Sequence, residues 1–190
     1  MRDALIEDGF LPHEFVGSAT IENNTEALAS KITQELKLKI NWNKNNPNTF
    51  NVLREEISNL GILVMQNGVV GNNNHRILNV AEFRAFVLID QYVPLIFLNA
   101  RDSTNAKVFS LCHELVHVWL GVDELYNDNF TSNQIVNNSQ LEKFCNEVAA
   151  EMLLPLSSIQ STLEPQLDIY TNIKHISKVF NVSELVVCIR

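Results

Sequence analysis

Two histidines and a glutamate carry the clearest chemistry in the sequence: His113, Glu114 and His117 form the pattern His-Glu-x-x-His. In a helix, side chains four residues apart lie one above the other, so both imidazoles can bind one metal ion at about 2.0–2.1 Å from each nitrogen. The pattern alone arises by chance in on the order of one chain in a few hundred of this length. Zinc is the expected metal. Glu114, about a quarter turn away, can take a proton from a metal-activated water and pass it to a leaving amine.

The surrounding residues predict that the motif lies on one helix whose opposite face is buried. Ser103 or Thr104 can cap the start of this helix, and Gly121 follows its end. At about 100° per residue an apolar stripe runs along the helix, made of Val108, Leu111, Cys112, Leu115 and Trp119. His113 and His117 fall on the other side, an arrangement that a chance match has no reason to show. Cys112 is therefore expected to be a small core residue and not a ligand.

A catalytic zinc site needs a third protein ligand besides a water molecule, and residues 142–151 offer carboxylates. If this segment is helical, Glu142 and Asn146 share one face. The alanine pair at 149–150 would let this helix approach the histidine helix closely, so Glu142 is the expected ligand. Asn146 is expected to accept a hydrogen bond from the second ring nitrogen of a ligating histidine. The other carboxylates point away and are expected to be solvated: Glu147 and Glu151.

The remaining pattern predicts helices around a small sheet. Helices are expected at 23–38, 49–60, 141–154 and 168–180, and from a cap at Ser183 to the end. Strands are expected at 62–65, 69–70, 83–90 and 94–99. Residues 1–22 show no clear period, residues 122–139 are expected to form a long surface loop near the site, and His75 is expected to be solvated in a loop. The sheet edge beside the site could pair with an extended peptide.

These elements indicate an α+β fold, with a small and mostly antiparallel sheet packed on the metal helix. The 190 residues are enough for a hydrophobic core and are interpreted as a single domain, 1–190. Within it, residues 1–60 would supply N-terminal helices, 61–155 the sheet and metal site, and 156–190 a C-terminal helical appendage.

Charge and cysteine content narrow the classes of function. The net charge of −8 and the pI near 5.1 argue against direct nucleic-acid binding, because neutralising phosphates requires a basic face. The last two helices resemble a helix-turn-helix, but with so little positive charge simple packing is the favoured interpretation. No apolar run has the length or position of a signal peptide or membrane span. Three cysteines without Cys-x-x-Cys spacing fit a reducing cytoplasm, the expected location.

The sequence resembles the ImmA/IrrE family of metallo-endopeptidases between about residues 61 and 155. The resemblance rests on the strand and loop from Pro94, the motif helix ending at Gly121, and the segment from Glu142 to Pro155. It implies a zincin-like fold. The wider gluzincin pattern continues with Glu-x-x-x-Asp, and this chain has Asn146 in place of the aspartate. The family implies cleavage of a helix-turn-helix repressor, linked to a mobile element or a stress response.

The expected reaction is hydrolysis of a peptide bond, with zinc on His113, His117 and Glu142 and with Glu114 as general base and then acid. A further donor for the oxyanion is expected, and three candidates stay open: Tyr126, Tyr170 and His175. The competing class is a non-catalytic, zinc-containing module that recognises a repressor or antitoxin. A third interpretation, an enzyme acting on a non-peptide amide, would need a small closed pocket.

Overall fold

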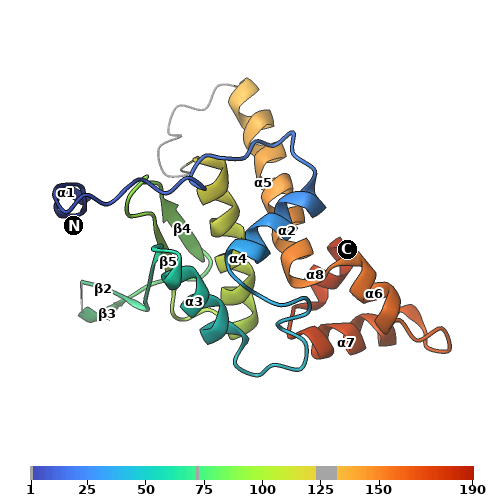
Figure 1. Ribbon diagram of the computed structural model, residues 1–190. Coiled ribbons are helices and arrows are strands. Elements are labelled where there is room, and N and C mark those ends of the chain that lie inside the picture. Colours follow the sequence, from blue (N-terminus) through green and yellow to red (C-terminus); the bar gives the residue numbers. More distant parts are fainter. Residues whose placement is uncertain (1, 72, 123–131) are drawn as a thin grey trace.

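The computed structural model describes residues 2–71, 73–122 and 132–190, and it has the expected α+β composition (Figure 1). The helices are α1 (Arg2–Glu7), α2 (Thr25–Glu35), α3 (Thr49–Asn59), α4 (Thr104–Leu120), α5 (Ser132–Leu153), α6 (Leu156–Thr162), α7 (Ile169–Phe180) and α8 (Glu184–Ile189). The strands are β1 (Leu63–Asn67), β2 (Val69–Val70), β3 (Asn73–Ile77), β4 (Ala85–Leu88) and β5 (Leu95–Asn99). Among these helices, none is long and apolar enough to cross a bilayer.

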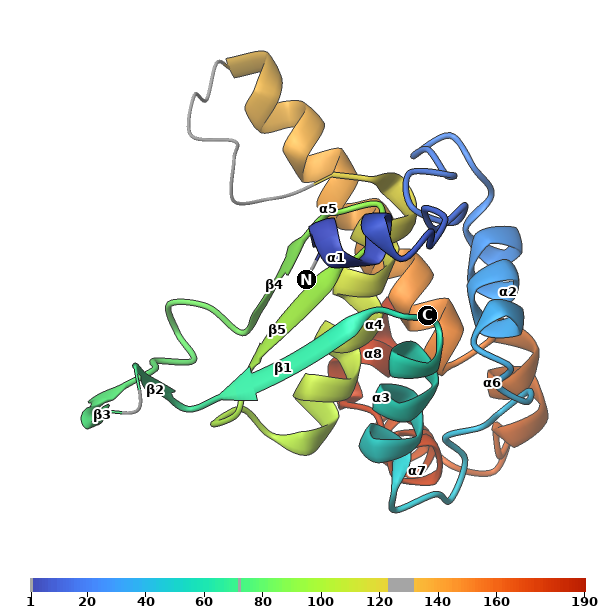
Figure 2. The ribbon, with the colours of Figure 1, turned by 60° about the vertical axis from the view of Figure 1, so that its left-hand side comes forward.

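A three-stranded sheet in the order β1-β5-β4 forms one layer of the molecule (Figure 2). The β4–β5 pair is antiparallel, as is the separate β2–β3 pair, but β1 runs parallel to β5 with Leu63 opposite Leu95. Helix α4 packs against β4 and β5, and α3 packs against β1. The expected packing of a small sheet on the motif helix is confirmed, with β4 as one of its two edges.

Helix α4 lies at the centre of the molecule, between the sheet and α5 (Figure 1). Ser103 caps it as expected, because the Ser103 side chain accepts a hydrogen bond from the Ala106 N–H at 3.3 Å. The apolar stripe is buried, but so are Val116, Val118 and most other residues from 108 to 120. The sequence predicted one buried face, whereas neighbours cover α4 on nearly every side.

The N-terminal segment, in which the sequence analysis found no clear period, covers the end of α4. Gly17 N–H donates to the Val118 carbonyl at 3.1 Å, and Ala19 N–H donates to the Trp119 carbonyl at 2.9 Å. The ring of Phe15 stacks on Trp119 with 4.7 Å between centroids. Carbonyls in the last turn of a helix lack partners within the helix, so residues 15–19 satisfy two of them and also cover the apolar end.

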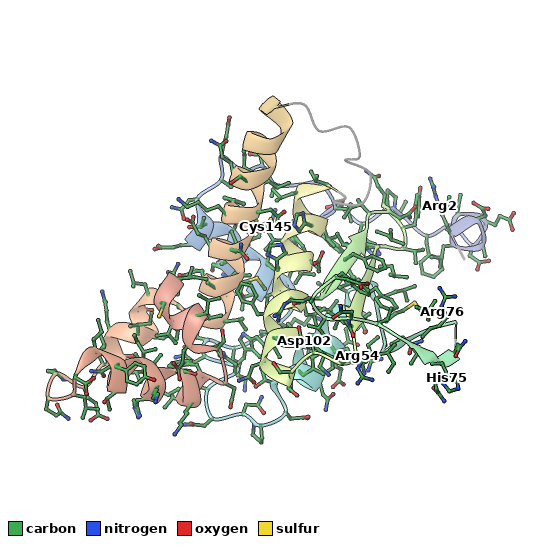
Figure 3. All side chains as sticks on the ribbon, turned by 180° about the vertical axis from the view of Figure 1, so that it is seen from behind. Arg2, Arg54, His75, Arg76, Asp102 and Cys145 are labelled. Atoms are coloured by element: carbon green, nitrogen blue, oxygen red, sulfur yellow. The ribbon has the colours of Figure 1, made fainter. Side chains whose placement is uncertain are left out.

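Three sequence predictions of local structure are wrong. The surface loop expected over 122–139 is shorter, because α5 already begins at Ser132; residues 123–131 lie outside the described residues. The loop expected around His75 is strand β3, although His75 is exposed as expected and projects with Arg76 from a hairpin far from α4 (Figure 3). The helix expected from residue 23 begins at Thr25, because Asn24 caps α2 by accepting a hydrogen bond from the Ala27 N–H at 2.9 Å.

The C-terminal helices pack as the sequence predicted. Asp168 and Ser183 cap α7 and α8, and the buried faces of these helices include Phe180 and Val186. Helix α8 packs against both α7 and α5. One cluster of buried hydrophobic residues extends from Val16 to Val187, and the division of the chain at 60 and 155 stays a prediction.

Candidate metal centre

The close packing of α4 and α5 brings the predicted ligands together. Val148, Ala149 and Ala150 of α5 are fully buried, and the small alanines allow the two helices to approach. Glu142, about two turns earlier on α5, faces the histidines of α4. Its Oε2 lies 3.2 Å from His113 Nε2, and its Oε1 lies 3.4 Å from His117 Nε2. His113 Nε2 and His117 Nε2 are 3.2 Å apart.

These separations fit one tetrahedral ion. Ligand atoms about 2.0–2.1 Å from a tetrahedral metal are about 3.3–3.4 Å from one another. The two histidine Nε2 atoms lie 3.2 Å apart, and each has a different Glu142 oxygen near it, at 3.2 Å for His113 and 3.4 Å for His117. Within the described part of the chain, this is the one group of His, Cys, Asp and Glu residues whose ligand atoms converge within 4.8 Å. Two imidazoles and one carboxylate form a donor set typical of catalytic zinc, which leaves a fourth position for water or substrate.

Asn146 contacts the ring nitrogen of His113 that does not face Glu142. The Asn146 Oδ1 lies 3.1 Å from His113 Nδ1, and because a carbonyl oxygen can only accept, this contact is a hydrogen bond when Nδ1 carries the proton. The unprotonated Nε2 then faces His117 and Glu142. The structure thus places Asn146 beside His113, where its side chain offers a neutral acceptor.

His113, Glu114 and Glu142 line a cleft of about 360 Å³ along the start of β4. It is lined by Glu82, Phe83, Arg84, Ala85, Phe109, Ser110, His113, Glu114, Glu142 and Asn146. His117 is fully buried behind it, whereas one third of the Glu142 side chain is exposed. Glu114 is only 4% exposed, so its carboxylate stands in a largely water-excluded wall beside the histidines. Few waters compete there for a proton that this carboxylate accepts.

Asn99 and Asp102 fix the strand edge that borders the cleft. The Asn99 backbone N–H donates to the Arg84 carbonyl at 2.8 Å, and its side-chain amide donates to the Phe83 carbonyl at 3.3 Å. Arg84 Nη1 lies 3.0 Å from Asp102 Oδ2. The start of β4 is therefore held in place, while its outer edge has no neighbouring strand in the three-stranded sheet.

Sequence reasoning missed Arg84, Phe109 and Ser110 as cleft residues. Ser110 lies three residues before His113 on the same helix, so helical spacing could have identified it. No such signal was available for Arg84, because it reaches the cleft only through the pairing of β4 with β5.

Of the three candidates for the oxyanion donor, the two that the structure describes do not line the cleft. Tyr126 lies outside the described residues. Tyr170 is 57% exposed on α7, with Lys174 Nζ 4.3 Å above its ring, and His175 Nε2 lies 3.7 Å from Glu164. Among described residues, neither α7 side chain lines the cleft, because α7 contributes none of its lining.

Of three predictions for residues near the site, two are confirmed and one is wrong. Cys112 is fully buried in the core as expected, and burial raises the pKa of its thiol far above the ordinary value, which keeps it protonated. The prediction that Glu151 is solvated is wrong: its side chain is 12% exposed and pairs with Arg190. Burial raises the pKa of the Glu151 carboxyl, and the Arg190 guanidinium partly opposes that shift. The side chain of Glu147 is 40% exposed, as expected.

A comparison with models of protein families finds a match, which covers most of the helices and strands described above. The family model described as the IrrE N-terminal-like domain, Peptidase_M78, matches residues 58–190. The match begins near the end of α3, includes the sheet, α4 and α5, and continues through α8. No curated protein matches the chain.

Proposed function

The chain belongs to the Peptidase_M78 family, and on that premise we propose that it is a zinc-dependent endopeptidase with His113, His117 and Glu142 as metal ligands. The observation that carries the proposal is the convergence of these three side chains, 3.2 to 3.4 Å apart, beside a buried glutamate in an open cleft. A bound zinc ion would supply Lewis acidity to a water molecule and to the scissile carbonyl.

Glu114 performs the proton transfers of the proposed reaction. Its carboxylate takes the proton of the attacking water and donates it to the nitrogen of the leaving amine, so that one residue acts as base and then as acid. Its position in the cleft wall, next to His113 in sequence and little exposed, suits this role. Asn146 keeps His113 Nδ1 protonated and thereby keeps Nε2 available.

The cleft suits an extended polypeptide better than a small amide. It lies open along β4, whose outer edge can exchange main-chain hydrogen bonds with a substrate strand. The proposed substrate is a helix-turn-helix repressor, supported by the resemblance in sequence. The net charge of −8 adds support, because a DNA-binding protein is basic and would be attracted to this chain.

Replacement of Glu114 by Gln tests the reaction. The zinc-loaded wild type is expected to cut a repressor encoded beside its gene at one defined bond, identified by mass spectrometry of the products. The Glu114→Gln variant should keep one zinc per chain but cleave at least about 100-fold more slowly. Glu147→Gln is the matched control, since it removes a carboxylate from the neighbouring helix α5 and should leave the rate unchanged.

Two results would overturn the proposal in different ways. Cleavage at the wild-type rate by Glu114→Gln would remove Glu114 from the reaction. A wild-type protein that holds zinc and binds the repressor, but leaves it intact, would instead be the non-catalytic recognition module.

A further inference from the structure

We propose that the space between α8 and the first turns of α4 is a substrate subsite for one large apolar side chain next to the scissile bond. Helix α8 would then determine which peptide bonds are cut. This inference rests on the proposed peptidase function and adds a substrate class to it.

The space is a cavity of about 660 Å³, within the range of about 300–1,000 Å³ that is usual for ligand pockets. Ala106 and Phe109 of α4 form one wall. Leu185, Val186 and Ile189 of α8 form the other. The rest of the lining consists of Arg84 and five uncharged polar residues: Ser103, Asn105, Ser110, Asn146 and Ser183.

The cavity is continuous with the metal cleft. Four residues line both spaces: Arg84, Phe109, Ser110 and Asn146. Asn146 hydrogen-bonds His113, so only one side chain separates the cavity from the proposed ligands. A substrate strand lying along β4 with its scissile carbonyl at the metal site would therefore bring a neighbouring side chain to the mouth of the cavity.

Helix α8 leaves apolar side chains uncovered at this place. Val186 is 2% exposed and packs into the core, but Leu185 is 69% and Ile189 40% exposed. Because these two residues are four apart, they lie on the same side of the helix. Exposed apolar side chains gathered around a concavity mark a surface that another molecule covers.

The charges around the cavity favour an uncharged occupant. Among the described residues that line it, Arg84 is the one charged group, and Asp102 already pairs with it at 3.0 Å. A buried lysine or arginine would find no carboxylate in this lining, and an unpaired buried charge is strongly unfavourable. Leucine, isoleucine, methionine or phenylalanine fits walls of this composition.

Cleavage of a defined equimolar peptide library, read by mass spectrometry, tests the subsite. The zinc-loaded wild type should select large apolar residues at one position adjacent to the cut. Leu185→Ala should reduce the ratio of kcat/KM for large apolar residues over alanine about tenfold. Ala106→Trp should narrow the cavity beside the metal cleft and shift the preference to glycine, alanine and serine. Ile169→Ala is the matched control, because Ile169 is 79% exposed on α7 and lies outside the cavity. The substrate preference of this variant should equal that of the wild type.

A binding measurement makes the test independent of turnover. Zinc-loaded Glu114→Gln protein is titrated with a fluorescein-labelled, alanine-rich peptide that carries one phenylalanine, and with its all-alanine counterpart. The phenylalanine peptide should bind about tenfold more tightly, and Leu185→Ala in the same background should remove that difference. Thermal melting verifies that each variant is folded.

The outcomes separate the two proposals. Cleavage with an unchanged preference in both Leu185→Ala and Ala106→Trp overturns the subsite and leaves the peptidase intact. Absence of cleavage by the wild type overturns the peptidase. The subsite is then judged by binding alone, and equal affinity for the two labelled peptides overturns it.

Discussion

The role proposed for Asn146 is to determine which ring nitrogen of His113 faces the metal. Its Oδ1 lies 3.1 Å from His113 Nδ1, which leaves Nε2 to converge with His117 and Glu142. A histidine released from such a partner can rotate or change tautomer, and both changes cost metal affinity.

Asn146→Ala is therefore expected to weaken zinc binding about 10- to 100-fold. Asn146→Asp should restore binding, because it returns an acceptor at the same place. Competition against a chromophoric chelator measures both affinities. The hydrogen bond would have no positioning role if Asn146→Ala bound zinc as tightly as the wild type. The same conclusion would follow if Asn146→Asp did not restore the zinc affinity.

At the residue scale, the sequence predicted what helical spacing determines. The pairs His113 and His117, and Glu142 and Asn146, are each four residues apart, so periodicity alone places them on common faces. The contact between Glu151 and Arg190 joins residues 39 apart, and such a pairing appears only when α8 packs on α5. This is why Glu151 was wrongly expected to be solvated.

Among the elements, α4 depends on a close approach of two glycines at its end. Gly121 has a φ of +68°, the left-handed conformation that ends many helices, and a Cβ added to it would lie 2.9 Å from Gly17 Cα. The backbone hydrogen bonds from Gly17 and Ala19 to the last turn of α4 require this approach.

Gly121→Ala is expected to lower the free energy of unfolding by more than about 2 kcal/mol, since left-handed strain alone costs roughly 1–2 kcal/mol and the contact with Gly17 adds to it. Gly71→Ala is the matched control. Gly71 has a φ of +56°, and the described part of the chain places no atom within 4 Å of an added Cβ. The free energy of unfolding of Gly71→Ala should therefore fall only by the contribution of left-handed strain. Urea unfolding followed by circular dichroism measures the free energy of unfolding of both variants. Equal losses of stability in the two variants would show that the approach of Gly121 to Gly17 is unimportant.

The elements that the sequence predicted well have strong local signals. Caps such as Ser103, Asp168 and Ser183 mark helix starts through hydrogen bonds to nearby backbone groups. The early start of α5 was missed because residues 132–139 are rich in asparagine and serine, which favour helices weakly on their own. The parallel pairing of β1 with β5 was missed because it joins strands about 30 residues apart and no turn specifies it.

Across the whole molecule, a connection near residue 43 ties the N-terminal half to the C-terminal helices. The Asn43 side-chain amide donates to the carbonyls of Leu153 at 2.8 Å and Phe180 at 2.7 Å, at the ends of α5 and α7. In addition, the side-chain amide of Asn181 donates a hydrogen bond to the Asn43 carbonyl at 3.0 Å. No local sequence signal predicts these hydrogen bonds, because the partners of Asn43 lie more than 100 residues away.

Asn43→Ala is expected to lower the free energy of unfolding by about 2–4 kcal/mol, because two buried carbonyls lose their donor. Asn59→Ala removes an exposed asparagine on α3 and should change stability by less than about 0.5 kcal/mol. Chemical denaturation of both variants compares the two effects. A loss for Asn43→Ala no larger than that for Asn59→Ala would mean that this connection does not hold the halves together.

X-ray absorption spectroscopy of the zinc-loaded chain tests the proposed metal centre most directly. We expect one zinc per chain with a first shell of nitrogen and oxygen only, at about 2.0 Å, including two imidazoles that disappear from the shell in the His113→Ala, His117→Ala double variant. A sulfur scatterer at about 2.3 Å, or a shell unchanged by that double variant, would place the metal elsewhere and contradict the assignment of His113, His117 and Glu142.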